Sequence, residues 1–376
     1  MKYNSSQYLR SLITSGILFL SPVIAHATQY TVTNIGTLGG TTASADGINS
    51  SGEVTGWSYT ASGSEHAFLY NNATMQDLGV VGNNTGSFAN GLNDSGQVVG
   101  KSFDSAGNGI AFISSAGPMS SLGTLGGLNS AATSINDSGN VVGWSDNTAG
   151  NMEAFLYSNG VMQGLGFLTS GSYSLASDIN KTGQISGWAE NNAGHMEAFI
   201  YSSGLMQGLG TLGGINSYAY GLNSSGQVVG QAANAAGNEQ AFLYSNGVMQ
   251  NLGTLGGTYG LAYAINSSGQ IVGESTNSSG STDAFIYNSG TMTDLNSLIG
   301  SSASLYTLTS ATAINASGQI AVNGIVKATG QNAAFILTPV SSASISGVPS
   351  PATTGLLGLS LLGFLLLNNK RKKISP

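Results

Sequence analysis

The sequence predicts an all-β fold, a seven-bladed β-propeller, from three observations: an internal repeat, a composition suited to strands and turns, and two array ends that complement each other. In the repeat, an apolar-Asn step is followed three residues later by Gly and then by an Ala-Phe pair. It occurs seven times, with Asn at positions 49, 93, 136, 180, 223, 266 and 315, at intervals of 43 or 44 residues and a last interval of 49. Repeats of roughly 40–45 residues are typical of four-stranded propeller blades, so each copy is expected to form one blade.

The composition supports short strands and tight turns. The 376 residues include 56 Gly, no Cys and only 7% charged residues, whereas helices favour Ala, Leu, Glu and Lys. Intrinsic disorder is the other interpretation of so much Gly, Ser and Asn, but 41% apolar residues arranged periodically favour a buried core. Residues 28–350 hold three basic and 16 acidic residues, a net charge of −13, which disfavours binding to nucleic acid. The lack of Cys excludes disulfides and thiolate catalysis.

Residues 1–27 are expected to be a cleaved signal peptide. Lys2 and Arg10 precede an apolar run over residues 12–25, which ends at the small-residue site Ala25-His26-Ala27. A transmembrane anchor is the alternative, but the run is shorter than the roughly 20 residues that a span needs. The mature chain is therefore expected to start near Thr28 and to be exported.

Residues 28–338 are the repeat domain, and the unit at residues 217–255 shows its pattern. Four short apolar segments, at residues 218–223, 227–230, 240–244 and 248–252, are predicted to be strands. Asn223-Ser-Ser-Gly226 and Ser245-Asn-Gly247 are predicted hairpin turns, because Asn and Gly tolerate positive φ. The other two connections are longer and are expected on one face, since each strand reverses direction. Recurring aromatic pairs, such as Phe242 with Tyr244, are expected to form the core between blades.

The two ends of the array predict how the ring closes. The last unit stops at Pro339 after its third strand, and residues 30–40 resemble a fourth strand without the first three. Pairing them in one blade gives a closed ring of seven and removes exposed edge sheets. A β-solenoid is the alternative architecture, but it gives no reason for the split unit.

The repeat resembles the extracellular HAF-repeat family, named for a His-Ala-Phe sequence followed by apolar residues. The full triplet occurs here at His66-Ala67-Phe68, and the Gly-Thr-Leu-Gly-Gly and Asn-x-Ser-Gly-Gln-Val-Val-Gly elements also match, over about residues 30–338. At the other six copies the His position holds Ile, Glu, Glu, Gln, Asp or Ala, so His has no general role. The resemblance implies an exported repeat protein without an assigned activity.

The C-terminal region has the pattern of a membrane-retention signal. A linker at residues 339–351 ends in Val348-Pro349-Ser350-Pro351, and residues 352–376 contain an apolar stretch and a basic tail. This order resembles the PEP-CTERM sorting signal of Gram-negative bacteria, although Ser350 stands where that family usually has Glu. The resemblance implies removal of the tail by an exosortase, a cell-surface or extracellular location and a link to exopolysaccharide and biofilm. A plain C-terminal anchor, with a short transmembrane segment that stays, is the alternative.

Three tryptophans are the candidate ligand-binding residues. Trp57, Trp144 and Trp188 each follow the Gly that is expected to end the second strand, which would place them at the edge of the face with the longer connections. Exposed Trp rings among Asn, Ser and Gly suit stacking against sugars. In the alternative interpretation each Trp packs against the neighbouring blade.

Glu153 and Glu197 are weaker candidates. They occupy the same position near the start of the third strand in adjacent repeats, where two carboxylates could hold Ca²⁺ or act as an acid/base pair in glycoside hydrolysis. Solvated loop carboxylates are the plainer interpretation. No catalytic motif, metal-binding motif or cofactor motif is present, so no catalytic residue, metal or cofactor is assigned.

From the sequence we therefore expect an exported cell-surface or matrix protein that acts as a non-catalytic structural or binding module, with polysaccharide as the favoured ligand. The alternative is a glycan-active hydrolase or lyase that uses the face with the longer connections. A purely structural matrix protein is the third possibility.

Overall fold

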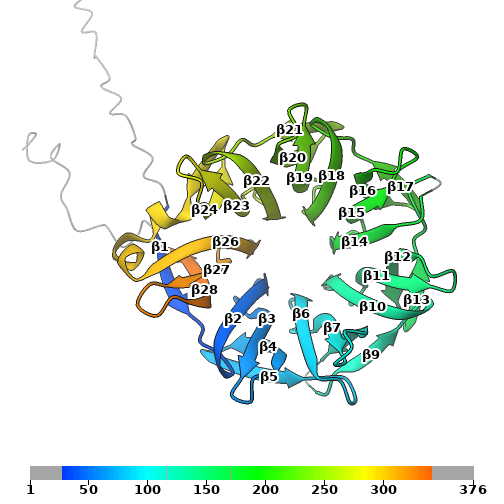
Figure 1. Ribbon diagram of the computed structural model, residues 1–376, viewed down its shortest axis with the longest axis horizontal. Coiled ribbons are helices and arrows are strands. Elements are labelled where there is room, and N and C mark those ends of the chain that lie inside the picture. Colours follow the sequence, from blue (N-terminus) through cyan, green and yellow to red (C-terminus); the bar gives the residue numbers. More distant parts are fainter. Residues whose placement is uncertain (1–27, 116, 170, 341–376) are drawn as a thin grey trace, which may run out of the picture.

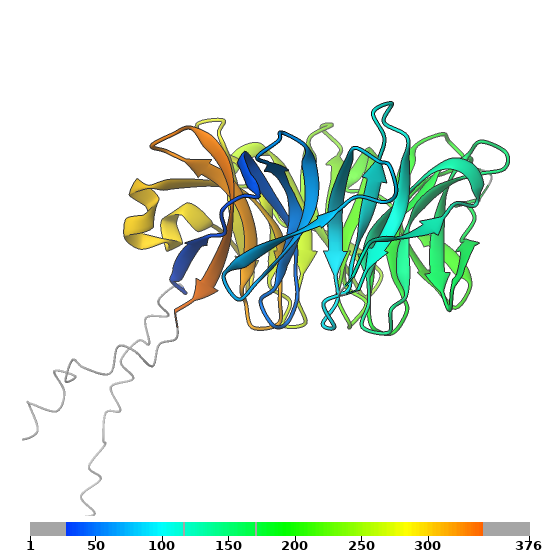
Figure 2. The same ribbon diagram turned by 90° about the horizontal axis from the view of Figure 1, so that it is seen from below.

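The protein is a ring of seven four-stranded antiparallel sheets (Figures 1 and 2). Cavities lined by residues of all seven blades form a central channel. The structure is a computed structural model that describes residues 28–115, 117–169 and 171–340. The predicted seven-bladed propeller is confirmed, and the solenoid alternative is wrong because the sheets close into a ring. The predicted signal peptide and the C-terminal sorting signal lie outside the described residues. Within the described residues, no helix has the length and apolar character needed to cross a membrane.

Each blade has an innermost strand against the channel and a second strand that follows the Asn turn. The innermost strands are β2 (Gly39–Ile48), β6 (Gly86–Leu92), β10 (Gly126–Ile135), β14 (Ser174–Ile179), β18 (Gly213–Leu222), β22 (Gly256–Ile265) and β26 (Tyr306–Ile314). The second strands are β3 (Val54–Thr60), β7 (Val98–Phe103), β11 (Val141–Asn147), β15 (Ile185–Glu190), β19 (Val228–Asn234), β23 (Ile271–Asn277) and β27 (Ile320–Val326).

The third and fourth strands complete the blades toward the outside. The third strands are β4 (Glu65–Asn71), β8 (Gly109–Ser114), β12 (Met152–Ser158), β16 (Met196–Ser202), β20 (Glu239–Ser245), β24 (Thr282–Asn288) and β28 (Gln331–Pro339). The fourth strands are β5 (Thr74–Gly79), β9 (Ser120–Gly123), β13 (Val161–Gly164), β17 (Leu205–Gly208), β21 (Val248–Asn251), β25 (Thr291–Asp294) and, in the closing blade, β1 (Tyr30–Asn34). Two short 3-10 helices, η1 (Leu295–Leu298) and η2 (Gly300–Ser304), occupy the extra residues of the 49-residue interval.

The N-terminal strand closes the ring as predicted. β1 pairs antiparallel with β28, so that Tyr30 lies opposite Pro339 and Asn34 opposite Phe335. A backbone hydrogen bond from the Val340 N–H to the Gln29 carbonyl, 2.8 Å long, extends this pairing. The closing blade therefore joins both ends of the repeat domain (Figure 1).

The seven repeated Asn residues form a second closure, at the channel end where the Asn turns lie. Each Asn is buried, and its Oδ1 accepts backbone N–H groups two and four residues on, which fixes the turn, as at Asn180 from Thr182 and Gln184. Its Nδ2 donates to the backbone carbonyl of the Asn in the next blade, at 2.9 to 3.2 Å. The last of these bonds runs from Asn315 to Asn49, so the seven bonds make a complete circle, which we call the Asn ring.

The core lies between blades, as predicted from the aromatic repeats. The Phe of each Ala-Phe pair is fully buried, and in one cluster Phe199 packs with Val142 and Ala154 of the preceding blade. In six of the seven blades a Gly of the second strand faces this Phe, as Gly187 faces Phe199, and in the closing blade Val322 faces Phe335. A side chain at Gly187 would collide with the carbonyl oxygen of Leu175 on the innermost strand, so this close approach requires glycine.

The second strands are longer than predicted, and this moves the tryptophans. β3 continues three residues past Trp57, and the turn to β4 is closed by hydrogen bonds from Thr60 N–H to Ser64 O and from Gly63 N–H to Thr60 O. The expected long connection between second and third strands is therefore a tight turn. The tryptophans lie within their strands rather than at the end of them, because the polar residues that suggested a loop continue the ladder.

Candidate functional site

The channel wall is shaped by a β-bulge that recurs in every blade. The pairing of the innermost strand with the second strand shifts register in all seven blades, around the residue three positions before the repeated Asn. A bulge leaves one residue out of the ladder and redirects its side chain. These residues, which we call the bulge ring, line the channel cavities; they are Asp46, Asn90, Thr133, Ser177, Tyr220, Tyr263 and Thr312.

Several bulge-ring residues tie neighbouring blades together. Ser177 donates its hydroxyl hydrogen to the carbonyl of Ala219 at 2.8 Å, and Thr133 donates to that of Ala176 at the same distance. Thr312 makes the equivalent bond to Ala45, and the amide of Asn90 donates to Ala132 at 2.7 Å. Every acceptor is the carbonyl of the buried alanine that precedes the bulged residue in the next blade. The hydrogen-bond donors of these side chains are therefore engaged in bonds that hold neighbouring blades together.

An aromatic arc lies on one side of the channel. The ring of Trp188 stands 5.7 Å from Tyr218 and 5.4 Å from Tyr220, and Tyr220 stands 5.8 Å from Tyr263, measured between ring centroids. Trp188, Tyr220 and Tyr263 line a cavity of about 320 Å³ together with Leu175 and the polar members of the bulge ring. Cavities of this size accommodate a small ligand or part of a larger one.

Two carboxylates, Asp46 and Asp178, line the channel at the level of the bulge ring, and their bonding differs sharply. Asp178 accepts three hydrogen bonds of 2.8 Å, from the hydroxyl of Ser134 and from the backbone N–H groups of Ile179 and Leu222. Asp46 accepts one, from the hydroxyl of Ser44 at 3.3 Å to Oδ1. Among the described residues Oδ2 of Asp46 has no hydrogen-bond partner. The fold uses Asp178 to join blades and leaves Asp46 available.

Burial shapes the ionisation of this region. Desolvation raises the pKa of Asp46 to about 7, and the hydrogen bond from Ser44 only partly opposes the effect. Desolvation also raises the pKa of Asp178. Burial raises the pKa of Tyr220 to about 12, and the negative charges of Glu239 and Glu274 act in the same direction. The tyrosines therefore remain neutral donors and acceptors at physiological pH.

The structure places the three predicted tryptophans in different surroundings. Trp188 lines the channel cavity. Trp57 packs edge-on against Tyr59 and against Phe88 of the next blade, with ring centroids 5.6 and 5.8 Å apart. Trp144 is approached by the ammonium group of Lys101, 5.7 Å from the ring centroid. All three are half-buried and lie where adjacent blades meet, so the structure does not gather them into one site.

Glu153 and Glu197 each join the third strand to the connection that leaves their own blade. Oε1 of Glu153 accepts the Gly166 N–H at 3.0 Å and Oε2 accepts the amide of Asn147 at 2.8 Å. Glu197 makes the matching bonds to Gly210 and Asn191. These contacts give both carboxylates a role inside the fold.

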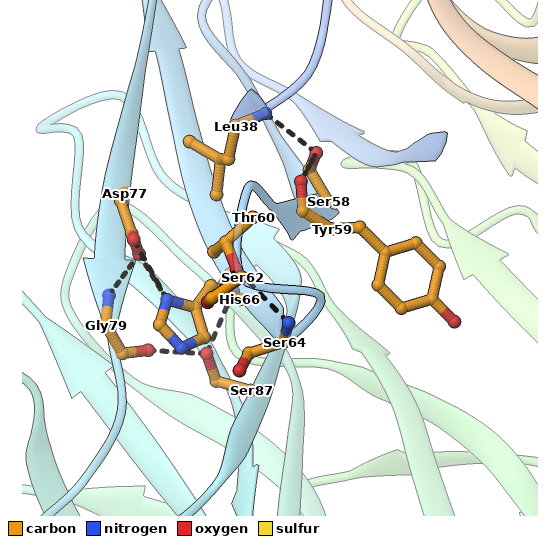
Figure 3. Close-up of polar contacts among 11 residues, drawn as sticks. Leu38, Ser58, Tyr59, Thr60, Ser62, Ser64, His66, Asp77, Gly79 and Ser87 are labelled. Carbon is orange, nitrogen blue, oxygen red and sulfur yellow. Dashed lines mark hydrogen bonds and ion pairs between the residues drawn. The ribbon is translucent and has the colours of Figure 1, made fainter. Parts of the chain in front are cut away.

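The other blades satisfy the equivalent N–H in a different way. In the first repeat the Gly79 N–H is accepted by Asp77, which lies two residues earlier on the fourth strand (Figure 3). Gly164 and Gly208 occupy the position of Asp77 in their repeats and have no side chain to accept this N–H. The Glu of the third strand accepts it instead, and a side chain at either Gly would collide with that Glu. The presence of Glu at 153 and 197 is thus coupled to Gly at 164 and 208.

His66, the one full match to the His-Ala-Phe triplet, contacts the same carboxylate. Its Nδ1 lies 2.9 Å from both carboxylate oxygens of Asp77, as Figure 3 shows. His66 holds the position of Glu153 in its own repeat, so it too links the third strand to the fourth. Within the described residues, no group of three or more His, Asp or Glu side chains is arranged to hold a metal ion.

Sequence reasoning missed the bulge ring, including Asp46, Tyr220 and Tyr263. A signal was present: the residue three positions before each repeated Asn differs in chemistry from copy to copy, whereas its surroundings recur. A bulge cannot be read from the alternation of side chains, because it breaks that alternation.

Comparison with known proteins identifies the architecture. No family model matches this sequence, and no curated protein matches it. Among solved structures, that of YCF48 bound to D1 peptide has 9% identity and a TM-score of 0.52, covering 86% of this chain and 98% of that one. A puromycin hydrolase mutant has 14% identity and a TM-score of 0.51, covering 78% of this chain and 53% of that chain. A puromycin-hydrolyzing peptidase from Mycobacterium tuberculosis has 12% identity and a TM-score of 0.50, covering 86% and 57%. At these identities the likeness shows the propeller fold alone.

Proposed function

We propose that this protein is a non-catalytic binding module that holds a polysaccharide at the channel, on the aromatic arc of Trp188, Tyr220 and Tyr263. The observation that carries the proposal is the cavity of about 320 Å³ in which these rings meet the polar bulge ring. Aromatic faces stack against the apolar faces of sugar rings, and nearby hydroxyl and amide groups bond to sugar hydroxyls. Of the three tryptophans predicted from the sequence, the proposed site keeps Trp188 and adds Tyr220 and Tyr263.

The cellular setting of the proposal rests on the sequence signals at the two ends of the chain. A signal peptide and a PEP-CTERM-like tail favour an exported protein at the surface of a Gram-negative cell, processed by an exosortase and held transiently at the membrane. An envelope or matrix polysaccharide would then be the available ligand. Catalysis is not part of the proposal, because Glu153 and Glu197 have partners within the blades.

Glycan-array binding tests the proposal, with two variants matched by their place in the repeat. Trp188→Ala removes the tryptophan ring that lines the cavity. Trp57→Ala is the matched control, because it removes a tryptophan at the same position of another repeat, outside the aromatic arc. We expect saturable glycan binding that Trp188→Ala weakens at least about tenfold, as expected for loss of a central aromatic contact, and that Trp57→Ala leaves unchanged.

Melting temperatures of both variants provide the control for folding. Absence of saturable binding to any glycan would refute the proposal, and so would equal losses in the two variants. Release of products from a bound glycan would instead favour the hydrolase or lyase alternative.

A further inference from the structure

The Ser and Thr hydroxyls of the channel cavity present hydrogen-bond acceptors rather than donors, because the fold has already used their hydrogens. Thr133, Ser177 and Thr312 each have one hydroxyl hydrogen, and each directs it to a backbone carbonyl. Their oxygen lone pairs are what remains for a ligand. A ligand that brings donors is therefore better matched to these three hydroxyls than one that brings acceptors.

Asp46 adds a carboxyl group to the same wall, and a cation beside it would hold this group in its charged form. Its carboxylate lines the cavity with the aromatic arc and receives one hydrogen bond, from Ser44. An ionised Asp has no hydrogen to donate, so it breaks the pattern in which bulge-ring side chains bond to the next blade. A partly buried carboxylate with an unpartnered oxygen is costly unless an ion or a donor meets it.

The arrangement around the ring places the charge opposite the aromatic rings. β2, which carries Asp46, stands across the channel from β14 and β18, whose blades carry Trp188 and Tyr220 (Figure 1). Asp46 and the aromatic arc line the same cavity, so a cation bound there would be attracted by the carboxylate and by the aromatic rings. Only three basic residues occur within residues 28–350, against 16 acidic ones, so the surroundings also favour a cation.

We propose that the polysaccharide bound here carries free amines, as in a partly or fully deacetylated aminosugar polymer, with one ammonium group seated against Asp46. The ammonium supplies three donors and no acceptor, which matches the lone pairs of the Ser and Thr hydroxyls and the carboxylate of Asp46. The sugar ring that carries it stacks on the aromatic arc. The inference rests on the proposed function and narrows it to one class of polysaccharide.

The test compares two ligands that differ only in the amine. The tetramer of glucosamine and the tetramer of N-acetylglucosamine are titrated into the full-length protein by calorimetry, at physiological ionic strength so that long-range attraction is screened. We expect the amine form to bind at least about tenfold more tightly, because an ion pair and a cation–π contact are lost on acetylation. Asp46→Asn is expected to remove this preference.

Two further variants keep the result interpretable. Asp94→Asn removes one negative charge at the Asn-turn end of the channel and keeps the oxygen that accepts the Ser50 N–H, so it should retain the preference. Asp46→Ser places in β2 the hydroxyl that Ser177 and Thr312 supply in other blades, and it replaces Asp46→Asn if that variant fails to fold.

The outcomes separate the inference from the proposed function. Equal binding of both tetramers, weakened by Trp188→Ala, would overturn the amine and leave polysaccharide binding standing. Binding of neither, with no other glycan bound, would refute both. A preference that survives Asp46→Asn and Asp46→Ser would show a general attraction to the acidic surface and overturn the assignment to Asp46. Tight binding of tetralysine in competition with the glucosamine tetramer would overturn the commitment to a sugar.

Discussion

Two rings of side chains, three residues apart in every repeat, surround the channel and behave in opposite ways. The Asn ring has the same residue in all seven blades, because each Asn fixes its own turn and bonds to the next. The bulge ring holds five residue types in seven positions, including one carboxylate and two tyrosines. The fold therefore requires one residue type at the Asn ring but tolerates several at the bulge ring. Side chains suited to binding a ligand can be accommodated at the bulge ring.

The largest expected effect comes from breaking the Asn ring. Asn180→Ala removes the acceptor of two backbone N–H groups and the interblade bond to Asn223, so we expect a loss of about 2–4 kcal/mol in the free energy of unfolding. Ser177→Ala, three residues away, removes one bond to Ala219 and should cost about 1 kcal/mol. Urea denaturation measures both. Equal losses would mean that the two rings do not differ as described.

A smaller effect should distinguish the two carboxylates, Asp178 and Asp46, that line the channel at the level of the bulge ring. Asp178→Ala leaves two buried backbone N–H groups and the Ser134 hydroxyl without their acceptor, which we expect to cost about 1–3 kcal/mol. Asp46→Ala removes a poorly bonded, desolvated carboxylate and should raise stability at neutral pH, by up to about 1–2 kcal/mol. Thermal unfolding of the two variants side by side checks this contrast, and a larger loss for Asp46→Ala would reverse the assignment of roles.

The smallest expected effect is a dependence of stability on pH that belongs to Asp46. Because burial raises its pKa from 3.8 to about 7, the folded state holds a proton that the unfolded state releases, so stability is greatest below pH 4 and falls as pH rises toward 7. We expect this part of the profile to amount to about 1–2 kcal/mol in an open, solvent-screened channel.

Asp178 contributes with the same sign, since burial also raises its pKa, and Tyr220 titrates far above this range. Subtracting the profile of Asp46→Asn from that of the unmodified protein therefore isolates Asp46. A difference that stays flat between pH 4 and 7 would show that the Asp46 carboxylate is already well solvated in the channel.

The repeat made much of the fold predictable from the sequence. The period gave the number of blades, the Asn and Gly positions gave the turns, and the incomplete last unit gave the closure by Tyr30–Asn34. These features are local or follow from the number of copies. The buried Phe of each Ala-Phe pair was predictable for the same reason.

The candidate site was less predictable because it depends on departures from regular pairing. The bulge at Tyr220 cannot be seen in an alternating pattern. Three bulge-ring hydroxyls bond to the next blade, and these bonds could be predicted only if the carbonyl that each hydroxyl faces were known. The partnership of Glu153 with the Gly166 N–H depends on the absence of a side chain at Gly164, a coupling between two strands. The tryptophans were found as a set, yet only contacts in three dimensions separate Trp188 from the other two.

The closing blade also determines how the protein would respond to mechanical force. Tyr30 at the start of β1 lies opposite Pro339 at the end of β28, so the two ends of the repeat domain leave the same corner of the ring. Pulling these ends apart would peel β1 from β28 one hydrogen bond at a time, which is the weak direction of an antiparallel pair. Pulling both ends together toward one surface would not separate the two strands, because the force acts on both in the same direction. A propeller held at a surface through both ends would therefore resist drag without opening at its closing blade, whereas a tether at one end alone would load the β1–β28 pair.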